Sequence, residues 1–329
     1  MAIATNTRTT YGAIGIREDL SNIIYNISPM DTPFLSGVGK GSADNTLFEW
    51  QTDELTAAAA NQQLEGDDSM NALAVAEPTR LTNYCQISYK AVQSSGTAEA
   101  VDFAGRKSSQ AYQLAKRAKE IKRDMEKMLL SNDVKVAGAA GTARKTAAVM
   151  SWLGTGSAGT SNIILGSASP VVGVTNTAAG THFAAFGTPA VLTMAMINLA
   201  MERCFTLGGE PSTIMAPADL KQKISALGGS VLADIQSNAA GDKPTTAVNA
   251  IDVLVTDFGT LKIVPSRLML ADMLFFVDFD FWSVDYLRPF QTETLAKTGD
   301  SIKQLMIAEY GLRAKNGLAN AAVIGVKDA

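Results

Sequence analysis

The clearest pattern of apolar and polar positions runs from Thr97 to Leu130. Apolar residues there recur at spacings that alternate between three and four, which predicts one long helix with a continuous apolar stripe. Lys127 lies near the end of this helix, where a cation suits the helix dipole. The stripe consists of Ala111, Leu114, Ala118, Ile121, Met125 and Met128. We expect it to face the core of the protein.

Two strand-like runs before this helix flank a long polar segment. The runs are Thr46 to Leu55 and Arg80 to Gln93, and the segment between them is rich in Ala, Asn, Gln and acidic residues. Long segments without secondary structure are uncommon in compact domains unless they have a function. The pattern therefore predicts an extended hairpin that projects from the body, with its tip at Glu65-Gly66-Asp67-Asp68.

The chain beyond the long helix alternates between helix and strand signals. A threonine N-cap and a proline at the first position predict a helix that begins at Thr188-Pro189 and ends at Gly208-Gly209. A buried strand, Ile214 to Ala216, and a third helix, Pro217 to Leu227, come next, and Leu232 to Pro244 is expected to form a polar loop. The apolar face of the helix after Thr188 is predicted to consist of Leu192, Ala195, Met196 and Leu199.

The last part of the chain is rich in strand signals. Residues 275 to 282 alternate in a way that is typical of a half-buried strand with one apolar and one mixed face. Ile302 to Leu312 and Ala321 to Val326 are predicted as further strands. The apolar face would hold Phe275, Val277, Phe279 and Phe281, and the mixed face Phe276, Asp278, Asp280 and Trp282.

Length and charge narrow the class of protein. A chain of 329 residues with 47% hydrophobic content can form one large or two moderate domains. With 28 basic and 32 acidic residues the net charge is −4, so any contact with nucleic acid is expected to be local and non-specific. The polar start, Met1 to Thr10, is no signal peptide, and no apolar stretch reaches the ~18 residues of a membrane span. Two distant cysteines fit a reducing cytoplasm.

No catalytic, cofactor or metal site emerges from the motifs. Gly39-Lys40 with Ser42 fails the phosphate-loop pattern because Phe34 stands where its first glycine belongs, so residues Gly37 to Ser42 are interpreted as a flexible turn. Asp278 and Asp280, with Asp285 nearby, could bind a divalent cation, although a solvated strand face is the favoured interpretation. His182, the only histidine, has no ligand at metal-binding spacing.

The long helix also carries many basic residues among acids. Such mixed charge usually marks a solvated helix face with i,i+4 pairs. The alternative is a weak electrostatic surface for packed DNA, for which Lys116 and Lys119 are the candidates. The basic residues are Arg106, Lys107, Lys116, Arg117, Lys119, Lys122, Arg123 and Lys127.

Several segments resemble the sequences of a known protein family. The order of polar arm, projecting hairpin, long helix, Gly/Ala-rich middle and β-rich return resembles the Hong Kong 97-type α+β fold of tailed-phage capsid proteins. The whole chain resembles their major head proteins, most closely in Arg17-Glu18-Asp19-Leu20-Ser21-Asn22-Ile23-Ile24, Ser28-Pro29-Met30-Asp31-Thr32-Pro33-Phe34, Phe48-Glu49-Trp50-Gln51-Thr52-Asp53-Glu54-Leu55 and Ala143-Arg144-Lys145-Thr146-Ala147.

This resemblance implies a division of the chain. Residues 1–37 would form an N-terminal arm, and 45–93 an extended loop that overlies a neighbouring subunit. Residues 97–141 and 269–329 would form the peripheral domain, with the spine helix at about 97–130. Residues 142–268 would form the axial domain.

The resemblance also implies partners. The chain would self-assemble as pentamers and hexamers into the icosahedral head of a virion, made in a bacterial cytoplasm, with scaffolding and portal proteins and a possible decoration protein. It would enclose double-stranded DNA without a membrane, a cofactor or catalysis. The loop tip, Glu65, Gly66, Asp67 and Asp68, would contact another subunit. An encapsulin-like compartment and an unrelated enzyme are the alternatives.

Overall fold

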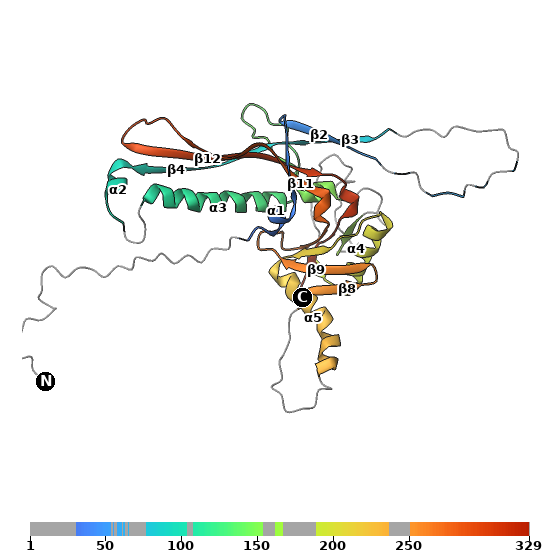
Figure 1. Ribbon diagram of the computed structural model, residues 1–329. Helices are drawn as coiled ribbons and strands as arrows, with labels where there is room; N and C mark the ends of the chain where they lie inside the picture. The colour runs from blue at the N-terminus through green and yellow to red at the C-terminus, as the bar shows by residue number, and fades with distance from the viewer. Residues whose placement is uncertain are drawn as a thin grey trace, which may run out of the picture.

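The computed structural model describes residues 31–53, 55, 58–60, 62, 65, 77–103, 108–153, 162–166, 189–236 and 251–328. Within them, two main sheets and their helices form two layers (Figure 1). The sequence-based predictions for the arm before residue 31, for Gly66, Asp67 and Asp68, for Arg106 and Lys107, and for His182 lie outside the described residues.

A four-stranded sheet of order β1-β11-β12-β4 forms the upper layer in Figure 1. The predicted strand at 302–312 is confirmed as part of β12, which pairs with β4 and β11 on either side. Helix α3 packs under β4 and β12. The strands are β1 (Gly39–Ser42), β4 (Gln86–Ser95), β11 (Trp282–Thr294) and β12 (Ser301–Ala314).

The predicted long helix consists of two helices, so its expected start at Thr97 is wrong. Helix α2 spans Gly96–Ala100 and α3 spans Ser109–Leu129. The chain leaves the first helix at Val101, whose backbone is extended, and the Ser108 hydroxyl caps the second. Glu99 of α2 also accepts hydrogen bonds from the Ser108 hydroxyl and from the backbone N–H of Gln110. The break therefore gives α3 a second cap.

The apolar stripe of α3 faces the protein interior over its second half. Ile121 and Met125 are fully buried, whereas Ala111, at the other end of the predicted stripe, is exposed. Two polar residues, Gln110 and Glu126, are buried as well. The stripe is thus confirmed at its centre and wrong at its beginning.

A six-stranded sheet of order β5-β13-β10-β7-β9-β8 forms the lower layer. It separates two cores: Phe275 of β10 packs in one and Phe276 in the other. The strands are β5 (Ile163–Leu165), β7 (Thr213–Ala216), β8 (Val253–Thr256), β9 (Gly259–Pro265), β10 (Met273–Val277) and β13 (Ala321–Ile324). A separate pair is formed by β6 (Ala190–Val191) and β14 (Val326–Lys327).

The predicted half-buried strand at 275–282 is wrong in two ways. All five residues of β10 are buried, because cores lie on both sides of the sheet. The strand ends at Val277, and a short 3-10 helix, η3 (Phe279–Phe281), follows. Further 3-10 turns are η2 (Val149–Trp152) and η4 (Gly317–Ala319).

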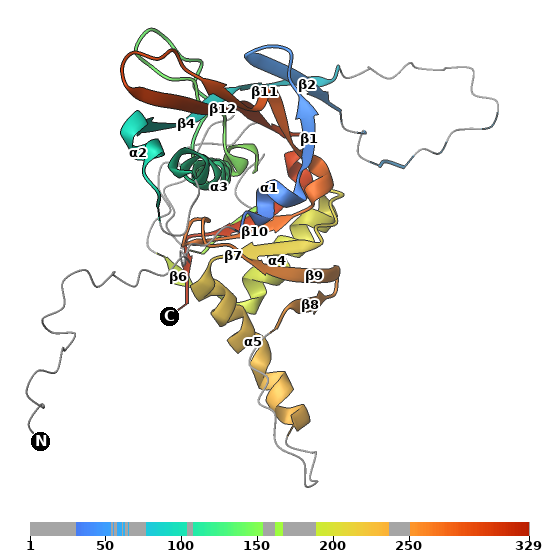
Figure 2. The same cartoon turned by 60° about the vertical axis from the view of Figure 1, so that its left-hand side comes forward.

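Helices α4 (Met194–Thr206) and α5 (Ala218–Gln236) lie beside the six-stranded sheet (Figure 2). The expected helix start at Thr188-Pro189 is wrong, since Ala190 and Val191 pair with β14 as a strand. The buried face of α4 consists of Ile197, Ala200, Met201 and Cys204. Of the predicted face, Leu192 is buried just before the helix, Met196 and Leu199 are partly buried against the same core, and Ala195 is exposed. Gly208, with a φ of 86°, follows the end of α4 as expected. Helix α5 runs into the stretch predicted as a loop from Leu232.

The first strand-like run is β2 (Leu47–Thr52), which pairs with β3 (Thr79–Tyr84) in an antiparallel hairpin. The second run divides at Cys85 into β3 and β4. Helix α1 (Pro33–Gly37) precedes β1, which had been expected as a turn. Gly41 suits this strand because a Cβ at this position would overlap the carboxylate of Asp285 on β11.

Candidate assembly site

The root of the extended loop is fixed to the four-stranded sheet by aromatic side chains. The rings of Phe48 and Trp50 stack at 5.7 Å, and Trp50 packs on Trp152 at 5.2 Å between ring centroids. The Phe48 ring lies over Gly311 of β12, where a Cβ would overlap it. Phe48 and Trp50 are two positions apart in β2, which places them on one side of the strand, and both are buried there.

An ion pair beneath these rings joins β11 and β12. The guanidinium of Arg313 lies 2.5 Å from the Asp285 carboxylate and under the rings of Phe48 and Trp50, 5.7 and 5.9 Å from their centroids. The Ser283 hydroxyl donates a hydrogen bond of 2.9 Å to Asp285, which is only 1% exposed. Since the cation contacts both rings, it links the loop root to the sheet.

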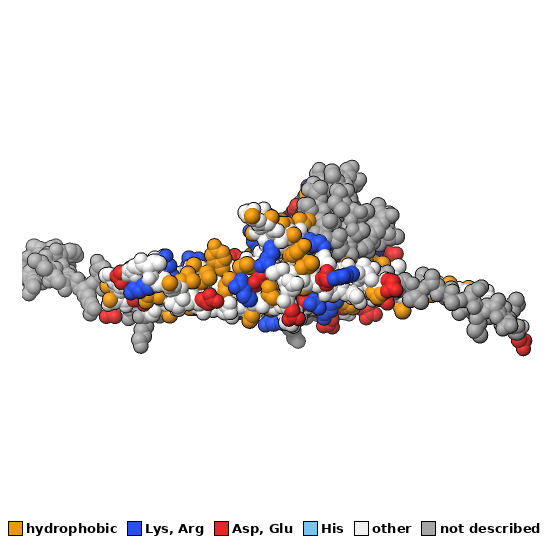
Figure 3. All heavy atoms as spheres, turned by 90° about the horizontal axis from the view of Figure 1, so that it is seen from above, with side chains coloured by type: hydrophobic (Ala, Val, Ile, Leu, Met, Phe, Trp, Pro, Cys, Tyr) orange, Lys and Arg blue, Asp and Glu red, His pale blue; other side chains and the backbone are white. Residues whose placement is uncertain are grey.

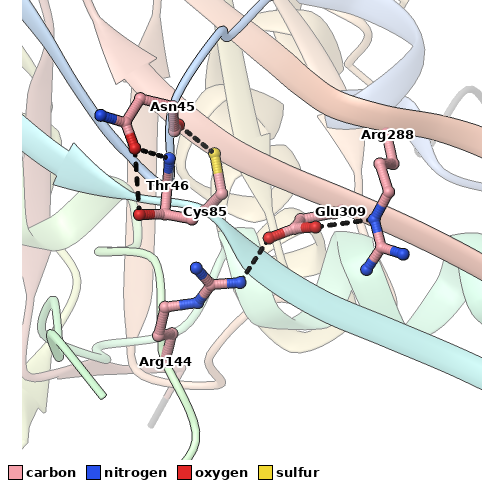
Figure 4. A network of polar contacts seen from close by, with 6 residues as sticks. All are labelled: Asn45, Thr46, Cys85, Arg144, Arg288 and Glu309. Atoms are coloured by element: carbon pink, nitrogen blue, oxygen red, sulfur yellow. Dashed lines mark hydrogen bonds and ion pairs between the residues drawn. The ribbon is translucent and has the colours of Figure 1, made fainter. Parts of the chain in front are cut away.

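A second ion cluster lies further along the same sheet (Figure 4). Glu309 of β12 is nearly buried and accepts hydrogen bonds from Arg144 at 2.5 Å and Arg288 at 2.8 Å. Arg288 stands at an irregularity in the pairing of β11 with β12. The two arginines place a net positive charge around one buried carboxylate and bring together three distant parts of the chain.

Cys85 lies between β3 and β4, at the edge of this cluster. Its thiol donates to the backbone carbonyl of Asn45 at 3.7 Å (Figure 4). Burial raises the pKa of the Cys85 thiol to about 11, and the negative charge of Glu309 adds to the rise. The neutral thiol is therefore a packing group and no nucleophile at neutral pH.

Buried Asn83 fixes the other strand of the hairpin. Its amide donates to the Thr146 hydroxyl at 2.9 Å and to the Leu312 carbonyl at 2.6 Å. Its side-chain oxygen accepts from the backbone N–H of Ala147 at 2.9 Å. These bonds fix both the hairpin and residues 146–147 against β12.

Glu126 anchors helix α1 to α3. Its two carboxylate oxygens accept the backbone N–H groups of Phe34 at 2.8 Å and Leu35 at 2.7 Å. Thr32, at the N-cap, makes no side-chain cap bond, so this distant acid takes the role of the cap. Burial raises the pKa of Glu126, and the two N–H groups oppose that rise.

A groove of about 510 Å³ lies between β1 and β2. We name it the β1–β2 groove. Arg313 lines its interior, and the exposed residues Lys40 and Lys315 belong to its wall. Its lining consists of Gly39, Lys40, Gly41, Ser42, Trp50, Gln51, Ser283, Asp285, Arg313 and Lys315.

The outer face of the four-stranded sheet, opposite α3, carries exposed apolar side chains. Ile87 is 43% and Tyr89 64% exposed on β4, whereas Val92, on the other face of that strand, is buried. In the view from above, hydrophobic side chains appear among charged ones along this face (Figure 3).

The residues predicted as sites do not converge on one place. Glu65 is exposed in a turn of the extended loop. Lys116 and Lys119 are exposed on α3, on the side away from Ile121 and Met125 by helical period. The mixed-charge interpretation of this helix is supported by the pair Arg117–Glu120 at 2.5 Å.

The aspartates considered for a cation are separated by the fold. Asp278 accepts the backbone N–H of Asp280 and caps η3, while Asp285 pairs with Arg313. The expected common strand face of the first two is therefore wrong. Among the described residues, no cluster of His, Cys, Asp and Glu could hold a metal ion, and no helix is long and apolar enough to cross a membrane.

Sequence reasoning missed the ion pairs that organise this site. Asp285 and Arg313 stand 28 positions apart, and Arg144 and Glu309 are 165 apart, so no local spacing connects them. Glu126 looked like one more surface acid on a charged helix. Its only local signal is its place next to Met125, near the apolar stripe.

The fold is that of phage capsid proteins. The chain superposes on the capsid asymmetric unit of cyanophage A-1(L) with a TM-score of 0.64 at 12% identity, covering 94% of this chain and 97% of that one. It superposes on the capsid of a native GTA particle with a TM-score of 0.63 at 11% identity, covering 98% and 100%. These likenesses confirm the predicted fold class.

Sequence comparison gives the family. The family model of the SU10 major capsid protein matches residues 3–327. The major capsid protein of Escherichia phage Phieco32 is 31% identical over 346 residues, covering 94% of each chain. The chain belongs to the SU10 major capsid protein family. It is a major capsid protein of a tailed phage, a structural component of the virion shell.

Proposed function

We propose that the extended loop is the part of each subunit that reaches a neighbouring copy in the shell. The observation that carries this proposal is the contrast between a fixed root and an exposed loop. Phe48 and Trp50 are buried at the root, whereas Leu55 is fully exposed and the described positions 58–60, 62 and 65 are exposed too. A projecting leucine gains its burial from another copy.

The proposed division of the chain follows the same logic. Residues 1–37 act as the arm, 45–93 as the extended loop, 97–141 with 269–329 as the peripheral domain, and 142–268 as the axial domain. In support, β11 and β12 from residues 269–329 pair with each other and with β4, whereas β5, β7, β8 and β9 from residues 142–268 lie in the six-stranded sheet, which also includes β10 and β13. Pentamers and hexamers then form by heterologous contacts that close into rings.

Limited proteolysis with a protease specific for Asp and Glu tests the loop tip. Cleavage near Glu65 should be fast in free subunits and strongly slowed in assembled shells, because the contact covers the tip. Cleavage after exposed Asp328, at the far end of the chain, serves as the control for protease activity on each sample. Equal cleavage at Glu65 in both states would show that Glu65, Gly66, Asp67 and Asp68 make no intersubunit contact.

Partners beyond a second copy are part of the same proposal. Solved structures of similar fold include a phage G capsid with gp26 decoration proteins and a satellite phage P4 procapsid with a size determination protein. We expect this shell to use scaffolding and portal proteins, to accept a decoration protein, and to enclose double-stranded DNA through non-specific contacts.

Lys116 and Lys119 are the proposed DNA-facing residues. Replacing both by alanine should spare shell formation and at most change the salt sensitivity of packaged DNA, because each phosphate contact is weak and sequence-independent. Replacing exposed Lys297 and Lys327 gives a control of equal charge. Loss of assembly in the first variant would assign these lysines to subunit contacts.

A further inference from the structure

We propose that the β1–β2 groove is the receptor for the acidic loop of a second copy. This inference rests on the proposed function, since it names the surface on which the extended loop docks. The loop is the occupant because of its charge, its exposure and the unpaired donors that the groove presents.

The groove is basic. Of its lining side chains, Lys40, Arg313 and Lys315 are cationic and Asp285 is anionic, so its net charge is 3 − 1 = +2. Arg313 is neutralised in place by Asp285. Lys315 donates to the Asp280 carbonyl at 2.8 Å and makes its contact with a neutral group. The two lysines therefore keep a positive rim.

The groove also holds donors in need of an acceptor. The indole N–H of Trp50 and the Nε–H of Arg313 are buried, and neither has a hydrogen-bond acceptor among the described residues. Buried donors are nearly always satisfied in native proteins, by protein or by water. A carboxylate offers several lone pairs at once, which matches two such donors under a cationic rim.

Glycines keep the groove open. Gly39 and Gly41 leave β1 without side chains on the face that it shares with Ser283 and Asp285. All four residues of β1 are exposed, and β1 is an edge strand. An extended segment can therefore approach the backbone closely there.

The loop has the complementary chemistry. Residues 54–78 contain five acidic residues and no lysine or arginine. The described loop positions 55, 58–60, 62 and 65 are exposed, so none of them fills the groove of its own copy. A capsid shell presents each copy with identical neighbours, and a loop–groove contact repeats at every such seam. A single exposed ion pair between loop and groove contributes little to the binding free energy. The register of the loop in the groove therefore depends on the same pairs repeating at every seam.

A charge-swap experiment on the full chain tests the pairing. The groove variant carries Lys40→Glu and Lys315→Glu, and the loop variant carries Glu65→Lys and Asp67→Lys. Each alone should reduce shell yield at least tenfold in sedimentation and electron microscopy, and combining all four should restore most of it. Lys297→Glu serves as the control, because Lys297 is exposed and does not line the groove. Circular dichroism establishes that each subunit remains folded.

A disulfide-crosslinking experiment in assembled shells tests the contact between loop and groove directly. Cysteines are introduced as Lys40→Cys and Asp67→Cys, while the natural Cys85 and Cys204 remain buried. Oxidised shells should give a ladder of disulfide-linked multimers on a non-reducing gel, and each single-cysteine variant should give none.

The outcomes separate this inference from the proposed function. If the loop variant fails to assemble while the groove variant assembles normally, the loop docks elsewhere and the groove assignment is wrong. If neither variant changes assembly, both proposals fail. A groove variant that assembles but loses DNA retention would assign the groove to nucleic acid and would likewise overturn the inference, as would the absence of the ladder.

Discussion

The two main sheets of this capsid protein use their faces differently. In the six-stranded sheet, every residue of β7, β10 and β13 is buried, and alternate side chains of β10 enter two separate cores. In the four-stranded sheet, only one face packs on α3. The other face of β4 exposes Ile87 and Tyr89. The first sheet is buried within the subunit, whereas the second leaves one face of β4 exposed.

The polar groups follow the same division. The buried ion pairs Asp285–Arg313 and Glu309–Arg144 both lie on the four-stranded sheet and its loop connections. Buried charge is costly unless it is paired, and it fixes geometry more than it adds stability. In an assembling protein, that fixed geometry positions the loop root. The comparison therefore predicts that damage to one sheet unfolds the subunit, while damage to the other mainly impairs assembly.

An acidic substitution in each sheet should give the largest difference between the two sheets. Phe276→Asp puts a charge between β10 and the second core, where no exposure relieves it, and should cost more than about 4 kcal/mol and leave insoluble protein. Tyr89→Asp, at a position 64% exposed, should leave a soluble, folded subunit with reduced assembly. Solubility, circular dichroism and shell yield measure both. Equal loss of solubility in the two variants would remove the proposed distinction.

Removing the buried acid under the loop root should have the next largest effect. Asp285→Ala leaves Arg313 without its partner, and we expect a loss of about 2–4 kcal/mol in the free energy of unfolding, by urea titration. The control is Asp252→Ala, whose carboxylate is 80% exposed beside Lys221 and should contribute about 0–1 kcal/mol. If Asp285→Ala is as mild as the control, the Arg313 contacts do not stabilise the root.

A single methyl group should disturb the loop root without touching its charges. Gly311→Ala places a Cβ into the Phe48 ring and should cost about 1–3 kcal/mol through overpacking, with a larger fractional loss of assembly than of folded subunit. Gly299→Ala is the control, since its Cβ would meet nothing within 4 Å. Thermal unfolding and shell yield check the pair. Unchanged yield would mean that the hairpin tolerates displacement from β12.

The sequence predicted strands correctly where their side chains follow a single hydrophobic pattern and that pattern matches their surroundings in the fold. The strand at β12 and the buried strand at β7 were predicted because their apolar residues are continuous or alternate cleanly. The aromatic run after residue 275 was misjudged, because a strand between two cores and a half-buried strand differ in what packs on them, which lies elsewhere in the chain. Asp278, interpreted as a surface residue of a strand, instead ends the strand as a cap.

The candidate site was less predictable than the fold. The aromatic pair Phe48 and Trp50 had a clear sequence signal, since their spacing places them on one side of a strand. Arg313 had no such signal, and Glu126 had only its place next to Met125, because their partners come from strands and helices that meet only in the folded chain. The glycine run at 37–41 was interpreted as a turn, since the need for a strand without side chains arises from Asp285 on β11.

The two buried cysteines allow the finest comparison between the sheets. Cys85 lies at the loop root and Cys204 on α4, beside the six-stranded sheet. Burial raises the pKa of Cys85 to about 11 and that of Cys204 to about 12, from 9.0 for an ordinary thiol. Both should react slowly with iodoacetamide at pH 8, because the thiolate is the nucleophile. Since both pKa values are raised by folding, the stability that these thiols contribute is present below pH 9.0 and is lost as the pH rises through their folded pKa values.

Assembly should separate the two thiols. Labelling of Cys85 at pH 8 requires the loop root to open, and a docked loop should slow that opening, so shell formation should reduce its rate several-fold. Cys204 should label at the same slow rate in subunits and shells, because opening of the second core does not involve the loop. Mass spectrometry of each cysteine peptide over time gives both rates, and the variants Cys85→Ser and Cys204→Ser confirm the peptide assignment. Equal protection of both cysteines by assembly would show that the shell stabilises the subunit as a whole, and that the loop root is no more sensitive to its neighbours than the core beside α4.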